Sequence, residues 1–589
     1  MTLGRFALLL VLATHPGALH AQTPSRDSLD SFVRAQMARR HIRGLSLAII
    51  QDGRVVVARG YGITDDSSRT RVTPSTLFQA GSISKPVAAL GVLHLVEAGR
   101  LTLDEDVNAR LTTWHVPDNT FTSTEKVTLR RILSHSAGLT VHGFPGYDRN
   151  VPRPTLVQVL DGAPPANTAP IRVDTTPGAI WRYSGGGFTV MQQLMIDVTG
   201  IPFPRYMQQA VLDPIGMTNS SYEQPQPAAR AARTAAGYYA DLSAVRARWH
   251  VYPEMAAAGL WTTPTDLARF AIEIQRTLAG HGHSVISPAM ARQYLTVQKA
   301  PSGLGIIVQD TGAMLNFSHG GRDEGFDAQL TAFAGTGQGA VIMINANDDS
   351  RFMGRLLDFI ARAWSWPRTG PDNGAPAATR GRPVPAAVLR YAGYFEVAEN
   401  QMLVLAPNAD TTGLETIVSG LPDESFLALD SLTFGSSERN LRLGFNAGAE
   451  ARVTAMRLRL GDPRERVVPR VAPLPSTVTP GADPDPALTA RIAAALQAVH
   501  QGGAALRDAA GITAGAKRDF SGGGDQALEG IGALTYIGTE DVSGRGIHRH
   551  DSEVARVRYY ACTTAAGRRY VLIHLAPADL LTDYDVVDR

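Results

Sequence analysis

The chain contains very little cysteine and very little lysine. Cys562 is its only cysteine in 589 residues, so no internal disulfide can form, and a metal site built from several cysteines is excluded. Only four of its 56 basic residues are lysines, namely Lys85, Lys126, Lys299 and Lys517. Arginine keeps its proton in a protein, whereas lysine can release it when its surroundings lower its pKa. A lysine beside a serine is therefore a candidate base for that serine.

Neither strong charge nor a long hydrophobic run is present. The formal net charge is +2, with 19% charged and 44% hydrophobic residues, which excludes a strongly basic nucleic-acid-binding chain. Residues 1–21 resemble a secretory leader, with Arg5 before an apolar run and Ala21 at a cleavage-like end. No segment is long enough to span a bilayer. We predict a cleaved leader and a periplasmic or secreted mature chain without a transmembrane span, an uncleaved anchor being the alternative.

The length and two proline-rich segments divide the chain. Residues 367–385 and 473–486 are predicted linkers, because they are rich in proline and small residues. Residues 28–366 have predicted strands at both ends and helical segments between them, which indicates an α+β fold with an antiparallel sheet. Residues 386–472 are predicted to form a small antiparallel sheet or barrel, and residues 487–589 a compact α+β module.

Apolar runs bounded by turn residues predict individual elements. In the first region, strands are predicted at 45–50, 54–60, 303–308, 329–333 and 340–345, with a closing helix over 351–364. In the last region, a helix is predicted over 487–499 and strands at 531–537, 554–560 and 570–575.

A serine–lysine pair stands at the start of one predicted helix. Ser82 and Lys85 are three positions apart, so a helix that begins near Ser82 places both side chains on one face, with β-carbons about 5–6 Å apart. The apolar residues from Val87 to Val96 predict this helix, and Pro86 is tolerated only in its first turn. The alternative is a buried helix in which a serine precedes a lysine by chance.

The same spacing occurs a second time, at Ser123 and Lys126. This pair lies in a polar stretch with no apolar helix behind it, and Glu125 is expected to pair with Lys126. We interpret it as a coincidental match, which shows that the spacing alone is a weak signal.

Three further clusters follow Ser82 and Lys85 in a fixed order. They are Ser134-His135-Ser136-Ala137-Gly138, Tyr183-Ser184-Gly185-Gly186-Gly187 and Ser318-His319-Gly320-Gly321-Arg322. Together they resemble the serine β-lactamase and penicillin-binding superfamily, most closely its branch of class C β-lactamases, D-aminopeptidases and esterases. The resemblance covers residues 28–366, including the stretch from Ala257 to Ala268.

The resemblance implies a role for each matching residue. Ser82 would be the acylated nucleophile, Lys85 its hydrogen-bonded activator and Tyr183 a proton shuttle. Whether Lys85 or Tyr183 takes the first proton stays open, because coupled groups share their titration. The chemistry implied is hydrolysis through an acyl-enzyme, and it needs no metal and no organic cofactor.

The third cluster is implied to bind the substrate. His319 would lie beside the nucleophile on a sheet-edge strand, and Gly320 and Gly321 would let the substrate approach that strand closely. The backbone N–H groups of Ser82 and Arg322 would form the oxyanion hole. His135 is expected to be structural.

Two departures from the family pattern narrow the chemistry. Gly185 stands where the family usually has an asparagine that would hold the substrate's amide, and His319 replaces a frequent lysine. Both changes favour esters or amine-ended D-peptides over penicillins, and Gly185→Asn is predicted to raise amide or lactam turnover relative to ester turnover. The substrate, small molecule or peptide, stays open among carboxylic esters, D-amino-acid peptides and amides, and β-lactams. The oligomeric state also stays open.

Other candidate sites are weaker. The histidine pairs His281/His283 and His548/His550 have no acidic or cysteine residue at ligand spacing in the sequence, and we expect solvated loops there. For the whole protein, the alternative to an enzyme is a non-catalytic binding or scaffold protein of the penicillin-recognising type.

Overall fold

The computed structural model describes residues 26–309, 312–348, 352–367, 386–398, 401–408, 413–418, 421–436, 441–447, 452–459, 466–521, 528–564 and 567–587. These residues form two compact units, the first ending at residue 367 and the second beginning at residue 386. The predicted leader and almost all of the predicted linker 367–385 lie outside the described residues. Within the described ranges, every helix is too short or too polar to cross a membrane.

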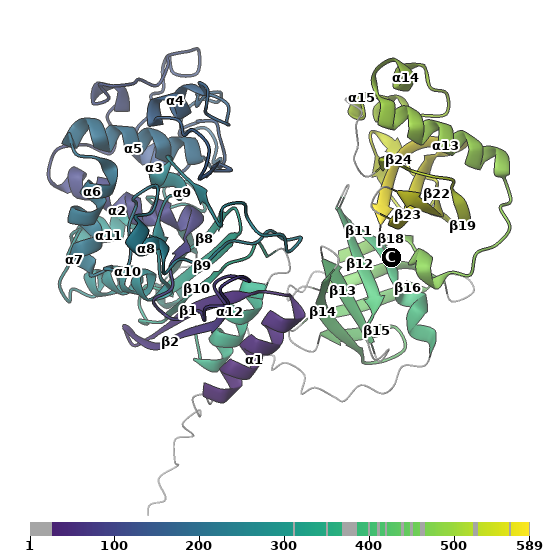
Figure 1. Ribbon diagram of the computed structural model, residues 1–589, viewed down its shortest axis with the longest axis horizontal. Helices are drawn as coiled ribbons and strands as arrows, with labels where there is room; N and C mark the ends of the chain where they lie inside the picture. Colours follow the sequence, from purple (N-terminus) through teal and green to yellow (C-terminus); the bar gives the residue numbers. More distant parts are fainter. Residues whose placement is uncertain are drawn as a thin grey trace, which may run out of the picture. The chain divides into compact units, whose positions relative to one another are not determined.

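A six-stranded antiparallel sheet organises the first unit (Figure 1). Its strand order is β2-β1-β10-β9-β8-β7, so strands from both ends of the unit pair directly, with Leu45 of β1 opposite Ile344 of β10. The strands are β1 (Gly44–Gln51), β2 (Arg54–Gly62), β7 (Ile307–Gln309), β8 (Asn316–Asp323), β9 (Phe326–Phe333) and β10 (Gly339–Ile344). The predicted α+β arrangement is confirmed.

The alternation of side chains along β1 separates two hydrophobic cores. Leu47 faces a core that α1 (Arg26–Arg39) and α12 (Phe352–Ala363) complete, where the rings of Phe32 and Phe359 stack with centroids 4.4 Å apart. Ala48 faces the opposite and larger core, which the helical part of the unit covers. Its helices are α2 (Ser84–Glu97), α3 (Leu129–Leu133), α4 (Leu156–Asp161), α5 (Gly185–Thr199), α6 (Phe203–Met207), α7 (Asp213–Ile215), α8 (Ala228–Ala231), α9 (Met255–Ala258), α10 (Pro264–Leu278) and α11 (Pro288–Tyr294).

The second unit begins with a closed antiparallel barrel, as the sequence predicted. Its interior is filled by large side chains such as Phe395, Phe434, Phe445 and Met456, which is usual for an eight-stranded barrel. Its strands are β11 (Gly393–Ala398), β12 (Gln401–Pro407), β13 (Gly413–Val418), β14 (Leu421–Ala428), β15 (Thr433–Ser436), β16 (Arg442–Ala447), β17 (Val453–Arg459) and β18 (Arg466–Ala472).

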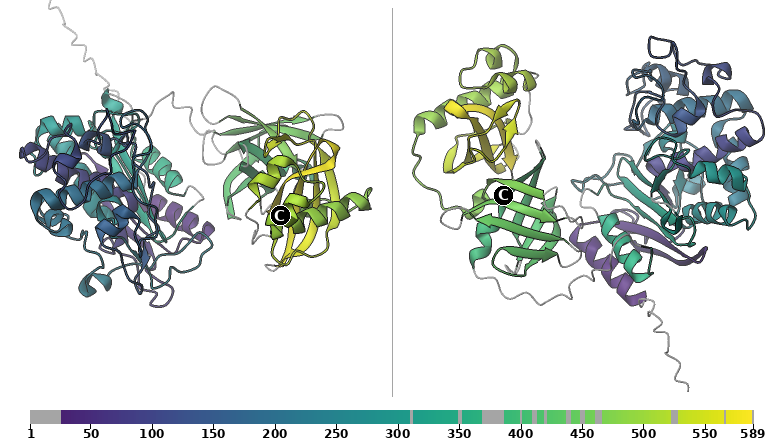
Figure 2. Two further views of the ribbon diagram at one scale, coloured as in Figure 1. Left: turned by 90° about the horizontal axis from the view of Figure 1, so that it is seen from above. Right: turned by 180° about the vertical axis from the view of Figure 1, so that it is seen from behind.

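A four-stranded sheet at the C-terminal end packs between this barrel and three helices (Figures 1 and 2). Tyr560 faces the helices, whereas its neighbour Tyr559 faces Tyr394 and Val471 of the barrel. The elements are α13 (Pro486–Gln501), α14 (Gly503–Asp508), α15 (Ala514–Asp519), β19 (Thr535–Asp541), β22 (Arg556–Thr564), β23 (Gly567–Ala576) and β24 (Leu580–Val587). The sequence analysis missed β24, in which polar residues interrupt the apolar pattern.

The expectation of a solvated loop at His548–His550 is wrong. His548 and Arg549 form the short strand β20, which pairs with β21 (Ser552–Glu553), and the Arg549 side chain is 1% exposed. Its Nη1 donates to Glu396 Oε1 of the barrel at 2.5 Å, and its Nε lies 3.0 Å from Asp583 Oδ2. These acidic partners are distant in the sequence, so local residue types could not reveal them.

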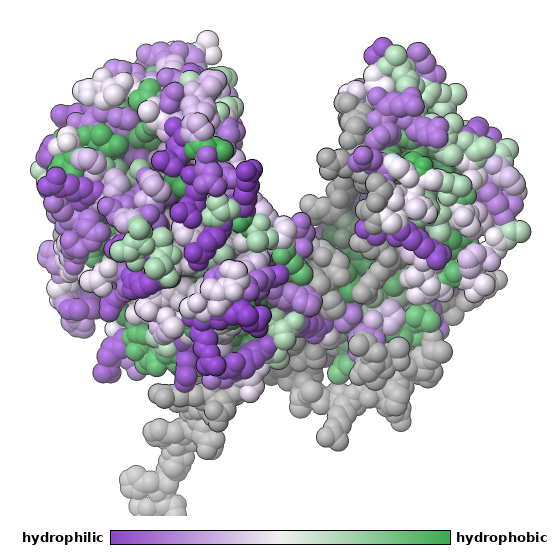
Figure 3. All heavy atoms as spheres, viewed as in Figure 1, coloured by the Kyte–Doolittle hydropathy of each residue, from purple (hydrophilic) through white to green (hydrophobic). Residues whose placement is uncertain are grey.

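On the face shown in Figure 3, hydrophilic and apolar side chains of the described residues are interspersed over both units. Most exposed large apolar side chains of the described residues are isolated in the sequence. Ile180 and Trp181 are adjacent to each other and are 45% and 37% exposed. Adjacent exposed apolar side chains commonly mark a binding surface.

Candidate active site

Ser82 lies in a 3-10 turn, η1 (Gly81–Ile83), which leads directly into α2. The helix itself begins at Ser84. Ser84 Oγ donates to Gly81 O at 2.6 Å and accepts from Leu260 N at 2.9 Å. Gly81 has φ +51°, a conformation that residues with a β-carbon rarely adopt. The serine is therefore presented from a turn that is held in place by neighbouring hydrogen bonds.

Lys85 is buried against Ser82. Its Nζ donates to Ser82 Oγ at 2.9 Å and to the backbone oxygen of Ala257 at 2.8 Å, and the residue is 2% exposed. The one-turn spacing along the chain thus places both groups in hydrogen-bond contact. Both of these partners are uncharged oxygen atoms, a hydroxyl and a carbonyl.

The second serine–lysine pair has a different environment. Lys126 pairs with Asp118 at 3.2 Å and is 42% exposed, while Ser123 Oγ donates to Thr120 O. Glu125 pairs with Arg131, so the expected Glu125–Lys126 pair is wrong. Ser123 and Lys126 thus bond to other partners and do not form the contact seen between Ser82 and Lys85.

Tyr183 lies just before α5 and packs beside the lysine. Lys85 Nζ is 4.9 Å from the centroid of its ring, and the ring stacks on His135 with centroids 4.3 Å apart. His135 Nδ1 accepts from Ser184 N at 3.2 Å, and burial holds the pKa of His135 well below its usual value. A neutral, buried ring under Tyr183 fits the structural role predicted for His135.

Strand β8 presses its backbone against the turn that carries Ser82. A β-carbon on Gly321 would lie 1.9 Å from Ala80 O, and one on Gly81 would lie 2.4 Å from Arg322 N. At Gly320 the nearest atom would be Gln329 Oε1, at 3.3 Å. Glycine at 321 and 81 therefore permits the close approach of the two segments, whereas the site at 320 is more open.

Strand β8 is an edge strand only in part. The strand β7 pairs with Asn316, Phe317 and Ser318, whereas β9 pairs with all of β8. The sequence analysis predicted a sheet-edge position for His319, and the pairing with β7 ends one residue before it, at Ser318. In the half that contains His319 to Asp323, the described strands pair with β8 on the β9 side alone. The other side of that half is turned to the cleft.

His319 lines the cleft as a neutral side chain. Its Nδ1 donates to Gly320 O at 2.6 Å, which leaves Nε2 as an acceptor, and in the described part of the chain Nε2 has no hydrogen-bond partner. Burial and, secondly, the nearby Lys85 lower the pKa of His319 to about 4. Near neutral pH this position therefore offers a lone pair rather than the positive charge that a lysine would supply.

A cleft of about 900 Å³ contains all of these groups. Ser82, Lys85, Tyr183 and the residues from His319 to Arg322 line it together. The other charged residues of its lining are acidic, namely Asp323, Glu324, Asp327 and Asp348. The guanidinium of Arg322 binds the Asp327 carboxylate through two hydrogen bonds of 2.8 Å, so its charge is already matched. Burial also raises the pKa of Asp323 well above its usual value, so the acidic residues of the lining do not all count as negative charges.

The predicted residue Gly185 also lies at this site, although outside the lining itself. It is the first residue of α5, after the N-cap Ser184, and its backbone N–H donates to His142 O at 3.0 Å. His142 lines the cleft, and so does Phe144. The residue therefore faces the loop that forms one wall.

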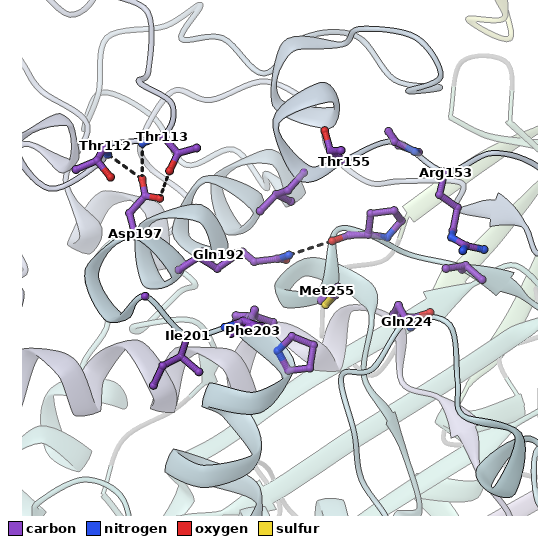
Figure 4. A pocket seen from close by; sticks show the side chains of 18 residues that line it. Thr112, Thr113, Arg153, Thr155, Gln192, Asp197, Ile201, Phe203, Gln224 and Met255 are labelled. Atoms are coloured by element: carbon purple, nitrogen blue, oxygen red, sulfur yellow. Dashed lines mark hydrogen bonds between the residues drawn. The ribbon is translucent and has the colours of Figure 1, made fainter.

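The short helix α9 lies between this cleft and a second pocket of about 710 Å³ (Figure 4). Met255 lines the second pocket, whereas Ala257 and Ala258 line the cleft. Gln192 holds the start of α9, because its Nε2 donates to Pro253 O at 3.0 Å and its Oε1 accepts from Ala256 N at 2.8 Å. The same helix thus positions the Ala257 oxygen that binds Lys85.

The buried carboxyl of Glu254, directly before α9, gives a pH-dependent prediction. Glu254 is 0% exposed, and burial raises its pKa to about 7. The folded chain therefore holds a proton that the unfolded chain releases, so stability falls as pH rises through this range. Glu254→Gln is expected to stabilise the protein by about 3 kcal/mol at pH 8 and by little at pH 5.

Thermal melts of wild type and Glu254→Gln at the two pH values check this, read on the transition of the first unit. Equal changes in melting temperature at both pH values would contradict it. Asp358→Asn, in the exposed part of α12, is the matched control for removal of a carboxylate.

Among the described residues of the second unit, one group of side chains has ligand atoms close enough for a metal. Atoms of His574, Asp583 and Asp585 lie within 4.8 Å of one another. His574 Nε2 is already 2.6 Å from Asp585 Oδ2, and Arg549 Nε is 3.0 Å from Asp583 Oδ2. The guanidinium supplies the positive charge that a metal would bring, so these residues form an ion-pair network.

Two residues of the site escaped the sequence analysis. Ala257 acts through its backbone oxygen, and a backbone group leaves no signal in residue type. Ala257 belongs to the stretch from Ala257 to Ala268 that contributed to the family resemblance, but the sequence analysis assigned it no role. Phe144 lines the cleft from a loop whose sequence carries no motif.

Comparisons with known proteins identify a family for the first unit. The sequence model of the Beta-lactamase family matches residues 29–363. The putative penicillin-binding protein PbpX of Bacillus subtilis is 24% identical over 318 residues, which cover 52% of this chain and 72% of that protein. Penicillin-binding protein 4 of Amycolatopsis lactamdurans is 26% identical over 378 residues, covering 60% and 93%.

The fold has a counterpart among solved structures. The octameric penicillin-binding protein homologue from Pyrococcus abyssi aligns with a TM-score of 0.51 and 20% identity, over 75% of this chain and 99% of that one. Because the family model matches more than half of the sequence, the chain belongs to the serine β-lactamase and penicillin-binding superfamily.

Proposed function

We propose that this protein is a serine hydrolase in which Ser82 is acylated by the substrate and freed by water. The contact between Lys85 Nζ and Ser82 Oγ, 2.9 Å long and buried at the floor of an open cleft, carries the proposal. Lys85 or Tyr183 accepts the hydroxyl proton as Ser82 attacks, and the proton passes to the leaving group. The N–H groups of Ser82 and Arg322 stabilise the oxyanion.

The proposed substrates are carboxylic esters and amine-ended D-amino-acid peptides or amides, in preference to β-lactams. His319 stays neutral near pH 7, and the guanidinium of Arg322 is bound to Asp327, so neither matches a substrate carboxylate. Glu324 adds negative charge at the lining, which favours an ammonium over such a group. Export to the periplasm or the medium belongs to this proposal and rests on the residue pattern of 1–21.

Labelling with a serine-directed fluorophosphonate tests the proposal. Wild type is expected to be labelled, Ser82→Ala to lose the label, and Ser123→Ala to keep it, because Ser123 has no adjacent base. Absence of label on folded wild type would favour the non-catalytic binding protein. A panel of p-nitrophenyl esters, D-alanyl anilides and a chromogenic cephalosporin then ranks the substrate classes.

A further inference from the structure

Phe144 occupies the space that a side chain at position 185 would need. A β-carbon on Gly185 would lie 3.0 Å from Phe144 Cε2 and 3.0 Å from His142 O, closer than β-carbons normally approach. An asparagine there would have to move the ring. Glycine at position 185 therefore allows the ring of Phe144 to lie where it does.

The ring of Phe144 belongs to the wall of the Ser82 cleft. It is half-buried, and Pro145, Trp181 and Ile307 line the same cleft. The indole of Trp181 is 37% exposed, and its Nε1 donates to Ser302 Oγ at 2.9 Å, which fixes the ring. Apolar rings held open to a cleft gain free energy when an apolar ligand group covers them.

We propose that Phe144, made possible by Gly185, forms an apolar subsite that selects esters with an aromatic or branched aliphatic acyl group. This inference rests on the proposed acyl-enzyme function and names its preferred acyl donor. The ring offers no hydrogen bond, so an amide placed against it would lose contacts with water that the ring does not replace. A phenyl or branched alkyl group has no such loss and gains the contact with the ring.

The variant Phe144→Ala tests the subsite with matched p-nitrophenyl esters. Its kcat/KM for the phenylacetate and isovalerate esters is expected to fall about 10-fold or more relative to the acetate ester. The acetate ester should change by less than about three-fold. Phe121→Ala is the matched control, because Phe121 is 40% exposed and does not line the cleft. Equal losses on all esters, or no loss on any, would overturn the inference.

The double variant Phe144→Ala/Gly185→Asn tests the coupling of the two positions. It is expected to prefer the p-nitrophenyl ester of N-acetylglycine over phenylacetate, whereas Gly185→Asn alone loses rate on both, because asparagine meets the ring. If Phe144→Ala does not fold, Phe144→Leu replaces it, with loss expected on phenylacetate and retention on isovalerate. A series of acetate esters with different alcohol groups is the further check. If kcat/KM of the Phe144 variant depended on the alcohol group instead of the acyl group, the assignment of Phe144 to the acyl side would be overturned.

Fluorophosphonate labelling of each protein distinguishes a failure of the proposed function from a failure of this inference alone. Unlabelled wild type would end the proposed function and this inference with it. Labelled wild type without any preference among acyl groups would end the inference alone.

Discussion

Lys85→Arg is expected to lower kcat/KM for ester hydrolysis by about three orders of magnitude. Arginine keeps a positive charge and several donors at this position, but it cannot accept the proton of Ser82. The lysine is 2% exposed and bonds both Ser82 Oγ and Ala257 O. Water therefore cannot take the place of its amine as the proton acceptor. Steady-state kinetics and fluorophosphonate labelling rate measure the effect.

Two further variants make this result interpretable. Lys126→Arg, in the exposed second pair, is expected to keep full activity, since Lys126 pairs with Asp118 at the surface. Lys85→Met keeps roughly the volume of lysine without its amine, and it should be as inactive as Lys85→Arg. If Lys85→Arg kept more than about a tenth of the wild-type rate, Lys85 would not be the essential base.

Gly321→Ala is expected to reduce kcat by about 100- to 1,000-fold. The added β-carbon would lie 1.9 Å from Ala80 O, so β8 and the turn of Ser82 must separate. That separation moves the N–H groups of Ser82 and Arg322 out of register, and loss of one oxyanion donor accounts for an effect of this size.

Gly320→Ala is the matched control on the same strand. Its β-carbon would meet only Gln329 Oε1, at 3.3 Å, and the tip of a glutamine can move. We expect a change in kcat of only a few-fold, which steady-state assays of the two variants compare directly. Similar losses in both variants would show that the close approach of β8 to Ser82 has no special role in the reaction.

Elements with strong local patterns could be predicted from residues alone. The strongly apolar stretch after Ser82 predicted α2, and short apolar runs predicted β1 and β10, which are neighbours in the sheet. The barrel followed from its short alternating strands. The buried pairing of Arg549 with Glu396 and Asp583 could not be predicted, since ion-pair partners far apart in the chain leave no local pattern.

By itself the sequence determined which side chains carry chemistry and which family they resemble, because residue type and spacing along a helix are local properties. Ser82 and Lys85 belong to that part. Only the tertiary structure decided what surrounds them: the Ala257 oxygen on Lys85, the contact of Gly321 with Ala80, and the ring of Phe144 beside Gly185. Those contacts join segments roughly 40 to 240 residues apart, and the packing of the whole unit creates them.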